Sequence, residues 1–225
     1  MHIEPGLVDA GKIWLSYVTA GAAGAYALKL AAAEIRARGA ASLAGRSLAT
    51  TALVFSFFEI LPHHPVGVSE VHLILGSTLF LLFGAAPAAL GLALGLLVQG
   101  LAFAPFDLPQ YGMNVTTLLV PLFALSALAR RIIAPNTPYV DLRYGQALAL
   151  STAYQAGIVA WVAFWALYGE GVGADNLASV ASFGAAYMLV IVVEPLVDLA
   201  VLAAAKGLRA LRGSGLVERR LYEAA

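Results

Sequence analysis

The most apolar stretch of the chain runs from residue 180 to residue 205 and reads VASFGAAYMLVIVVEPLVDLAVLAAA. It is longer than the about 20 residues that a helix needs to cross a hydrocarbon core of about 30 Å. Its only charged side chains are Glu194 and Asp198. The run is continuous and lacks the alternating pattern of the strands in a membrane barrel. This stretch therefore predicts a transmembrane helix.

Six further apolar runs precede it, and the turn-forming residues between them set their limits. The segment Pro62-His63-His64-Pro65 separates the second run from the third, and Gly84 to Pro87 separates the third from the fourth. Proline cannot continue a helix but suits a first turn. The sequence thus predicts an all-α membrane protein, a polytopic bundle of about seven transmembrane helices in a single domain over residues 1–225. The six earlier spans are 13–33, 47–61, 71–86, 87–104, 113–129 and 144–168.

The composition excludes several other classes of protein. Hydrophobic residues make up 61% of the 225 and charged residues 12%, about half the charged share of a soluble domain. With 13 basic and 13 acidic side chains, no basic surplus favours nucleic acid. The absence of cysteine excludes disulfides, thiolate zinc sites and iron–sulfur clusters. No GxxxxGK[ST] motif is present, so no ATP site is expected in this chain.

The basic residues predict the orientation of the bundle. If seven spans are present, all but Lys12 lie on one side of the membrane, which the positive-inside rule assigns to the cytoplasm. The N-terminus is then outside, and residues 206–225 form a basic cytoplasmic tail. The outer loops hold carboxylates and histidines without cations, which suits a cationic ligand. The inner residues are Lys29, Arg36, Arg38, Arg46, Arg130, Arg131, Arg143, Lys206, Arg209, Arg212, Arg219 and Arg220.

All four histidines map to the outer side, and two of them are placed where metal binding is plausible chemistry. His72 opens an apolar run, where an uncompensated polar group is costly. His2 can chelate one metal through the Met1 amine, its own amide and its imidazole, provided that Met1 is retained. Tetragonal nitrogen sites suit Ni(II) and Cu(II), and imidazole also suits Co and Zn. We expect residues 1–12 to fold back into the outer mouth of the bundle, seated by Ile3, Leu7 and Val8.

Three short patches carry a resemblance to a known family. The opening Met1-His2-Ile3-Glu4-Pro5-Gly6, the segment from Phe57 through His72-Leu73 to Gly76, and the stretches Val98-Gln99-Gly100 and Gly112-Met113-Asn114 are similar to the CbiM/NikM family. Its members are the substrate-binding components of energy-coupling factor cobalt and nickel transporters. The resemblance covers roughly residues 1–130. The order of Glu4 and Pro5 and the segment Glu70-Val71 depart from the family pattern.

The resemblance implies a function and a set of partners. It implies capture of Co²⁺ or Ni²⁺ at the outer face of a prokaryotic inner or plasma membrane, with Met1, His2 and His72 as the metal ligands. It also implies a transmembrane coupling subunit, two separate ATP-binding-cassette ATPases and a small accessory membrane subunit, and it allows a link to cobalamin biosynthesis. The chain itself is then a transporter component and not an enzyme. Its surroundings are membrane lipid.

Other residues have both a functional and a purely structural interpretation. Asn114 either holds the N-terminal segment or caps a helix, and Glu59 either orients the metal site or lies at the interface. His63 and His64 either relay the metal inward or are simply exposed. A surface of small residues on the first span either docks the coupling subunit or packs within the bundle. This surface comprises Ala20, Ala23, Gly24 and Ala27.

Two other classes of function remain as alternatives. A self-sufficient secondary metal carrier is expected to show inverted repeats and acids near the midplane, for which Glu194 is the only hint. An intramembrane metalloenzyme is expected to show three ligands around an open metal position and a general base. No HEXXH motif is present, although Glu70 lies near His72 in the sequence.

Overall fold

The computed structural model describes residues 2–223, and in this part of the chain seven α-helices form one bundle. Short 3₁₀ turns connect or follow them, and a two-stranded antiparallel hairpin lies between the second and third helices. The helices are α1 (Trp14–Arg38), α2 (Ala40–Glu59), α3 (Gly76–Phe83), α4 (Ala85–Ala102), α5 (Tyr111–Ile132), α6 (Tyr144–Glu170) and α7 (Ala174–Gly207). The strands are β1 (His64–Val66) and β2 (Ser69–Val71), and the turns are η1 (Pro105–Gln110), η2 (Tyr139–Asp141), η3 (Arg209–Leu211) and η4 (Arg219–Leu221).

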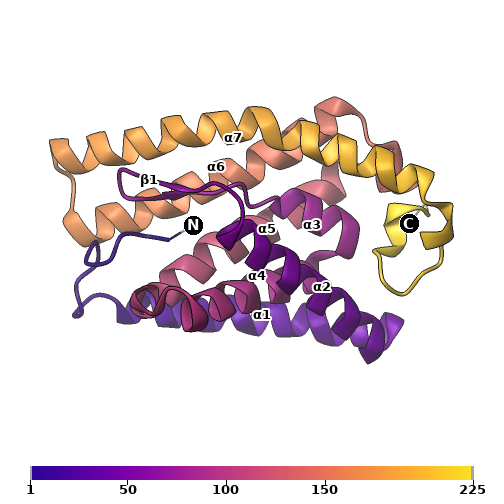
Figure 1. Cartoon of the computed structure of the whole chain (residues 1–225), viewed down its shortest axis with the longest axis horizontal. Helices are drawn as coiled ribbons and strands as arrows, with labels where there is room; N and C mark the ends of the chain where they lie inside the picture. The colour runs from indigo at the N-terminus through magenta and orange to yellow at the C-terminus, as the bar shows by residue number, and fades with distance from the viewer. Residues whose placement is uncertain (1, 224–225) are drawn as a thin grey trace.

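The long helices lie roughly side by side along the longest axis of the molecule. Helices α6 and α7 form one side of the bundle and α1 the opposite side, with α3, α4 and α5 between them (Figure 1). The hairpin and the N-terminal segment lie together among the helices, away from the end of the molecule that carries the C-terminus. The hairpin and the C-terminus therefore lie in different parts of the bundle.

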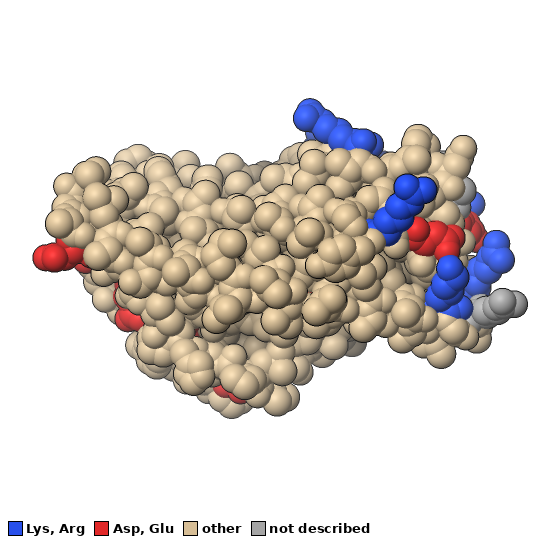
Figure 2. Space-filling view, turned by 90° about the horizontal axis from the view of Figure 1, so that it is seen from above, with Lys and Arg blue, Asp and Glu red and all other residues tan. Residues whose placement is uncertain are grey.

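Five helices are long and apolar enough to cross a membrane. They are Ala40–Glu59, Ala85–Ala102, Pro105–Ile132, which joins η1 to α5, Tyr144–Glu170 and Ala174–Gly207. The molecule is therefore an all-helical, multi-pass membrane protein, as predicted. Figure 2 shows the Lys and Arg side chains of one face gathered toward the end that carries the C-terminus, where acidic side chains lie among them, whereas the opposite end shows acidic side chains alone.

The predicted helix over residues 71–86 is wrong in its first third. Val71 belongs to β2, and the helix begins only at Gly76, after Leu75 adopts a left-handed conformation with φ of 55°. At about 1.5 Å per residue, the eight residues of α3 span far less than a hydrocarbon core of about 30 Å. The extended residues before it are tolerated because they are enclosed by the bundle: His72, Ile74 and Leu75 are all buried.

Small residues bring α2 and α4 into close contact. A Cβ atom on Gly91 would lie 2.3 Å from the Thr50 hydroxyl, and one on Gly95 would lie 2.6 Å from a methyl group of Val54. Both distances are shorter than side chains allow, so these two positions require glycine. The spacing of Gly91 and Gly95 is the GxxxG pattern of close helix packing in lipid.

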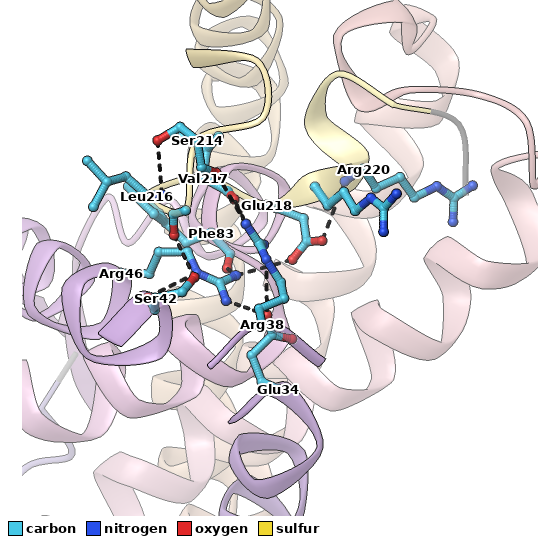
Figure 3. Close-up of polar contacts among 12 residues, drawn as sticks. Glu34, Arg38, Ser42, Arg46, Phe83, Ser214, Leu216, Val217, Glu218 and Arg220 are labelled. Atoms are coloured by element: carbon cyan, nitrogen blue, oxygen red, sulfur yellow. Dashed lines mark hydrogen bonds and ion pairs between the residues drawn. The ribbon is translucent and has the colours of Figure 1, made fainter. Parts of the chain in front are cut away.

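The basic tail predicted after residue 205 is folded against the bundle. Arg46 of α2 is fully buried and pairs with Glu34 of α1 and with Glu218 of the tail, at 3.5 Å in the second case. Arg38 donates to the carbonyl of Val217 at 2.7 Å. Figure 3 shows how these side chains tie the ends of α1 and α2 to the returning tail. Because a buried charge requires partners, the tail is part of the fold at this end.

Candidate metal site

The N-terminal segment joins the β-hairpin as a short third strand. Ile3 pairs with Ser69, and the amide of Glu70 donates to the carbonyl of His2 at 3.0 Å. The Ser69 hydroxyl donates to the same carbonyl at 2.9 Å. Ile3, Leu7 and Val8 are buried, as predicted. Residues 2–8 are therefore anchored in the bundle through both backbone and side chains.

Two glycines allow this close approach. Gly67 forms the tip of the hairpin with φ of 61°, and a Cβ there would lie 2.1 Å from the carbonyl oxygen of Ser179 on α7. On α6, a Cβ on Gly169 would lie 1.9 Å from the carbonyl oxygen of Leu7. The hairpin thus packs directly on the backbone of α7, and the N-terminal segment packs directly on that of α6.

This packing brings His2, Glu70 and His72 together. One potential ligand atom from each lies within 4.8 Å of the others. Oε2 of Glu70 is 2.7 Å from Nδ1 of His2 and 3.0 Å from Nε2 of His72. Both imidazole rings therefore direct a nitrogen at one small region. Two nitrogens and a carboxylate oxygen are a donor set that first-row divalent metals accept.

The second nitrogen of His2 is also held. Its Nε2 lies 2.8 Å from Oε1 of Gln99 on α4 and 3.8 Å from a carboxylate oxygen of Asp107 in η1. Both neighbours are acceptors, so they favour a proton on Nε2. That leaves Nδ1 as the nitrogen for a metal. The acceptors that contact Nε2 also fix the orientation of the ring.

The carboxylate of Glu70 is kept ionised by its neighbours. Burial alone would raise the pKa of Glu70, but the hydrogen bonds from His2 and His72, together with their charges, hold it well below its usual range. With the metal absent, the contact of Nδ1 with this carboxylate requires a proton on Nδ1. A metal that binds Nδ1 displaces that proton.

Aromatic rings close the site on one side. The Phe58 ring from α2 packs edge-on against His72 at 4.9 Å and against His2 at 5.6 Å between ring centroids. His63 stacks on His72 at 4.9 Å. The amide of Ile3 donates to Oδ1 of Asn114 at the start of α5, at 2.9 Å. The site is therefore built from the N-terminus, the hairpin and the ends of α2, α4 and α5.

Comparison with models of known protein families shows which family the chain belongs to. The model of CbiM, the cobalt uptake substrate-specific transmembrane region, matches residues 2–211. The chain belongs to the CbiM family. The match extends well beyond the first 130 residues in which the resemblance was visible, so the later helices are part of the family pattern as well.

Two solved structures have the same fold as this CbiM-family chain. One is described as a transition metal transporter, with a TM-score of 0.69, 18% sequence identity, and coverage of 93% of this chain and 94% of that one. The other is a truncated transition metal transporter, with a TM-score of 0.68 and 18% identity, covering 92% and 99%. At this identity they show the fold alone. A comparison with curated protein sequences gives no match.

Some of the residues predicted to bind the metal or to assist its binding lie together in this CbiM-family structure, and others do not. His2 and His72 lie side by side, with ring centroids 5.3 Å apart, whereas Met1 lies outside the described residues. Glu59 ends α2 and forms no hydrogen bond or ion pair with any described residue. His64 is exposed in β1, and only His63 contacts the cluster. The metal-binding roles of all these residues stay predictions.

The sequence alone does not place Glu70 or Asp107 at the site. Glu70 stands out only as an acid near His72, because the fold-back that turns it toward His2 depends on the hairpin. Asp107 is buried and faces His2. Its only sequence signal is a position in a loop without basic residues, and several exposed acids share that feature.

The small residues of α1 differ in exposure. Ala23 and Ala27 are buried in the bundle, which fits the alternative of packing within the chain's own bundle. Ala20 and Gly24 are half-buried, and a Cβ on Gly24 would meet no atom within 4 Å. Docking through this part of α1 stays a prediction for these two positions.

Proposed function

We propose that this chain captures Co²⁺ or Ni²⁺ at the outer face of the membrane, as the substrate-specific component of an ATP-driven energy-coupling factor uptake transporter. The observation that supports the proposal is the convergence of His2, Glu70 and His72 at the outer mouth of a CbiM-family bundle. The metal is the transported substrate, and it stays bound at this site until transport.

In this proposal, nitrogen ligands account for most of the affinity for the metal. The Met1 amine, the His2 amide and Nδ1 of His2 supply a fused chelate, and Nε2 of His72 supplies the fourth nitrogen. The backbone amide of His2 has to lose its proton to join such a chelate. A four-nitrogen set favours Ni(II) and Cu(II) and accepts Co(II). Glu70 offsets the metal charge from beside the chelate.

The topology that goes with this function has seven crossings, with the N-terminus outside and the C-terminus in the cytoplasm. The segment from His72 to Gly84 counts as the third crossing, half extended and half helical. The gathering of basic side chains toward the C-terminal end (Figure 2) supports this orientation. The proposed location is the inner or plasma membrane of a prokaryotic cell.

The energy for uptake comes from partners in this proposal. A transmembrane coupling subunit and two ATP-binding-cassette ATPases bind this chain, with a small accessory membrane subunit alongside. ATP is hydrolysed by those ATPases, and this chain carries out no catalysis. The alternative is a self-sufficient secondary carrier. An intramembrane metalloenzyme is less well supported, since the sequence has no HEXXH motif.

The decisive experiment is a one-residue N-terminal extension. Placing one glycine before Met1 displaces the amine and breaks the fused chelate, while His2 and His72 keep their places. Calorimetry of Ni²⁺ and Co²⁺ binding to purified protein, with intact mass confirming the N-terminus, should show a loss as large as that in His2→Ala or His72→Ala. Replacing exposed His64 by Ala is the matched control and should have little effect. Unchanged affinity in the extended form would make the chelate assignment wrong.

A second measurement tests the class of transporter. Cells that make this chain alone should bind metal without concentrating it, whereas cells that also make the coupling subunit and ATPases should accumulate it. Accumulation that needs only this chain and a proton gradient would favour the secondary carrier.

A further inference from the structure

Two carboxylates lie deep within the bundle and are not part of the cluster of His2, Glu70 and His72. Glu194 and Asp198 are one turn apart on α7, both are fully buried, and both are flanked by apolar residues along the helix. No described Lys, Arg or His side chain forms an ion pair with either of them. Two uncompensated negative charges at this depth would be very costly.

Their hydrogen bonds indicate how that cost is avoided. The Ser77 hydroxyl on α3 lies 2.7 Å from Oδ2 of Asp198 and 3.1 Å from Oε1 of Glu194. A hydroxyl has a single proton to donate. If Ser77 donates to Asp198, its closer partner, the contact with Glu194 is favourable only when Glu194 donates to the Ser77 oxygen. Glu194 must then be a carboxylic acid.

Neighbouring polar groups surround this pair, and two buried atoms among them lack a partner. Thr78 donates to Asp198, and the Gln155 amide nitrogen on α6 contacts Glu194. The Gln155 carbonyl oxygen, on the same amide, has no hydrogen-bond donor, and the Tyr154 hydroxyl has no partner either; both residues are fully buried. A Cβ on Gly76, the residue before Ser77, would lie 2.7 Å from the Tyr154 hydroxyl, so this hydroxyl lies beside the start of α3. Buried polar atoms without partners beside two carboxylates indicate a site that takes up a further proton or a water molecule.

We propose that Glu194, Ser77 and Asp198 form a proton-binding site within the membrane. One proton resides on Oε1 of Glu194 and donates to Oγ of Ser77, which in turn donates to Oδ2 of Asp198. When the proton on Glu194 moves to Ser77, the hydroxyl proton of Ser77 moves to Asp198. The net change is one proton transferred from Glu194 to Asp198, with the serine hydroxyl restored.

The site also contacts the start of α3, which directly follows the non-helical residues 72–75 and the proposed metal ligand His72. Ser77 and Thr78 begin α3, only a few residues after His72, and Tyr187 of α7 hydrogen-bonds the backbone of His72. The other titratable side chains around the pair are Tyr154 of α6 and Tyr187 of α7. Loss of the proton would leave two adjacent carboxylates on α7 that repel one another, and it would remove the hydrogen bond from Glu194 to Ser77 on α3. The proton therefore adds a hydrogen bond between α3 and α7.

Infrared spectroscopy of the purified chain in lipid tests the site directly, because a protonated carboxylic acid has a carbonyl band apart from that of carboxylates. At neutral pH the native protein should show this band, and Glu194→Gln should abolish it. Asp198→Asn should retain it. Ser77→Ala should retain it at a higher frequency, since the acid loses its acceptor, and Ser77→Thr should restore the native frequency. An Asp107→Asn variant identifies any signal from that acid.

Several outcomes would overturn the proposal. A native spectrum without the band, or a band that persists in Glu194→Gln once Asp107 is accounted for, means that Glu194 is ionised. A band lost only in Asp198→Asn reverses the assignment. Disappearance of the band when Mn²⁺ is added identifies a metal site in place of a proton site. Retained Ni²⁺ binding by Glu194→Gln shows that the variant is folded, and the native spectrum as a function of pH gives an answer even if a variant does not fold.

Discussion

Nδ1 of His2 lies 2.7 Å from Oε2 of Glu70, although the two residues are 68 positions apart in the sequence. The contact exists because the N-terminal segment adds to the hairpin that carries Glu70. It makes one carboxylate oxygen the partner of both imidazoles, since Nε2 of His72 is 3.0 Å away. Glu70 therefore controls the proton that His2 must release before a metal binds.

Replacing Glu70 by Gln should weaken Ni²⁺ and Co²⁺ binding by about 10- to 100-fold, the range for groups that orient metal ligands. The amide keeps the size of the side chain but removes the charge that offsets the metal. Calorimetry on purified protein measures the change. The matched control is Glu59→Gln, because Glu59 has no partner among the described residues, and it should bind as the native protein does. Equal affinities in the two variants would show that Glu70 has no role at the site.

The helices could be predicted from the sequence alone, whereas the hairpin could not. Long apolar runs such as residues 180–205 have only one way to satisfy their backbone in lipid, so composition predicts them. The run that begins at Val71 is equally apolar, yet it is enclosed by protein and needs no helix until Gly76. His2 and His72 were found because an N-terminal chelate and a histidine in an apolar run are local signals. Glu70, Gln99 and Asp107 depend on how distant segments meet, which no local pattern encodes.

Metal affinity should rise with pH. Metal binding displaces protons from Nδ1 and from the backbone amide of His2, so a higher proton concentration weakens binding. Glu70 does not contribute to this dependence near neutral pH, because its pKa is held below its usual range and it stays ionised. Calorimetry in buffers with different ionisation enthalpies should detect at least one proton released for each metal bound. Binding without proton release would exclude both a deprotonated His2 amide in the chelate and a proton on Nδ1 of His2 before the metal binds.

Gly24→Leu should weaken association with the coupling subunit while leaving metal binding unchanged. A Cβ at this position meets nothing within 4 Å, so the larger side chain projects outward without disturbing the bundle. Co-purification measures the association and calorimetry measures metal binding. Gly91→Leu is the contrasting variant: its side chain would collide with Thr50, and both properties should fail. Retention of full association by Gly24→Leu would exclude this part of α1 as the docking surface.

The anchoring of the N-terminal segment predicts a distant substitution that affects the metal site. Gly169→Ala on α6 places a Cβ 1.9 Å from the carbonyl oxygen of Leu7, so residues 2–8 must move away from α6. That movement shifts His2 relative to His72, and a chelate that depends on both should lose affinity at least tenfold. Gly145→Ala on the same helix is the matched control, because a Cβ there meets nothing within 4 Å. The helical content of both variants should match the native protein by circular dichroism. If Gly169→Ala binds Ni²⁺ as tightly as Gly145→Ala, contact between the segment and α6 does not position His2.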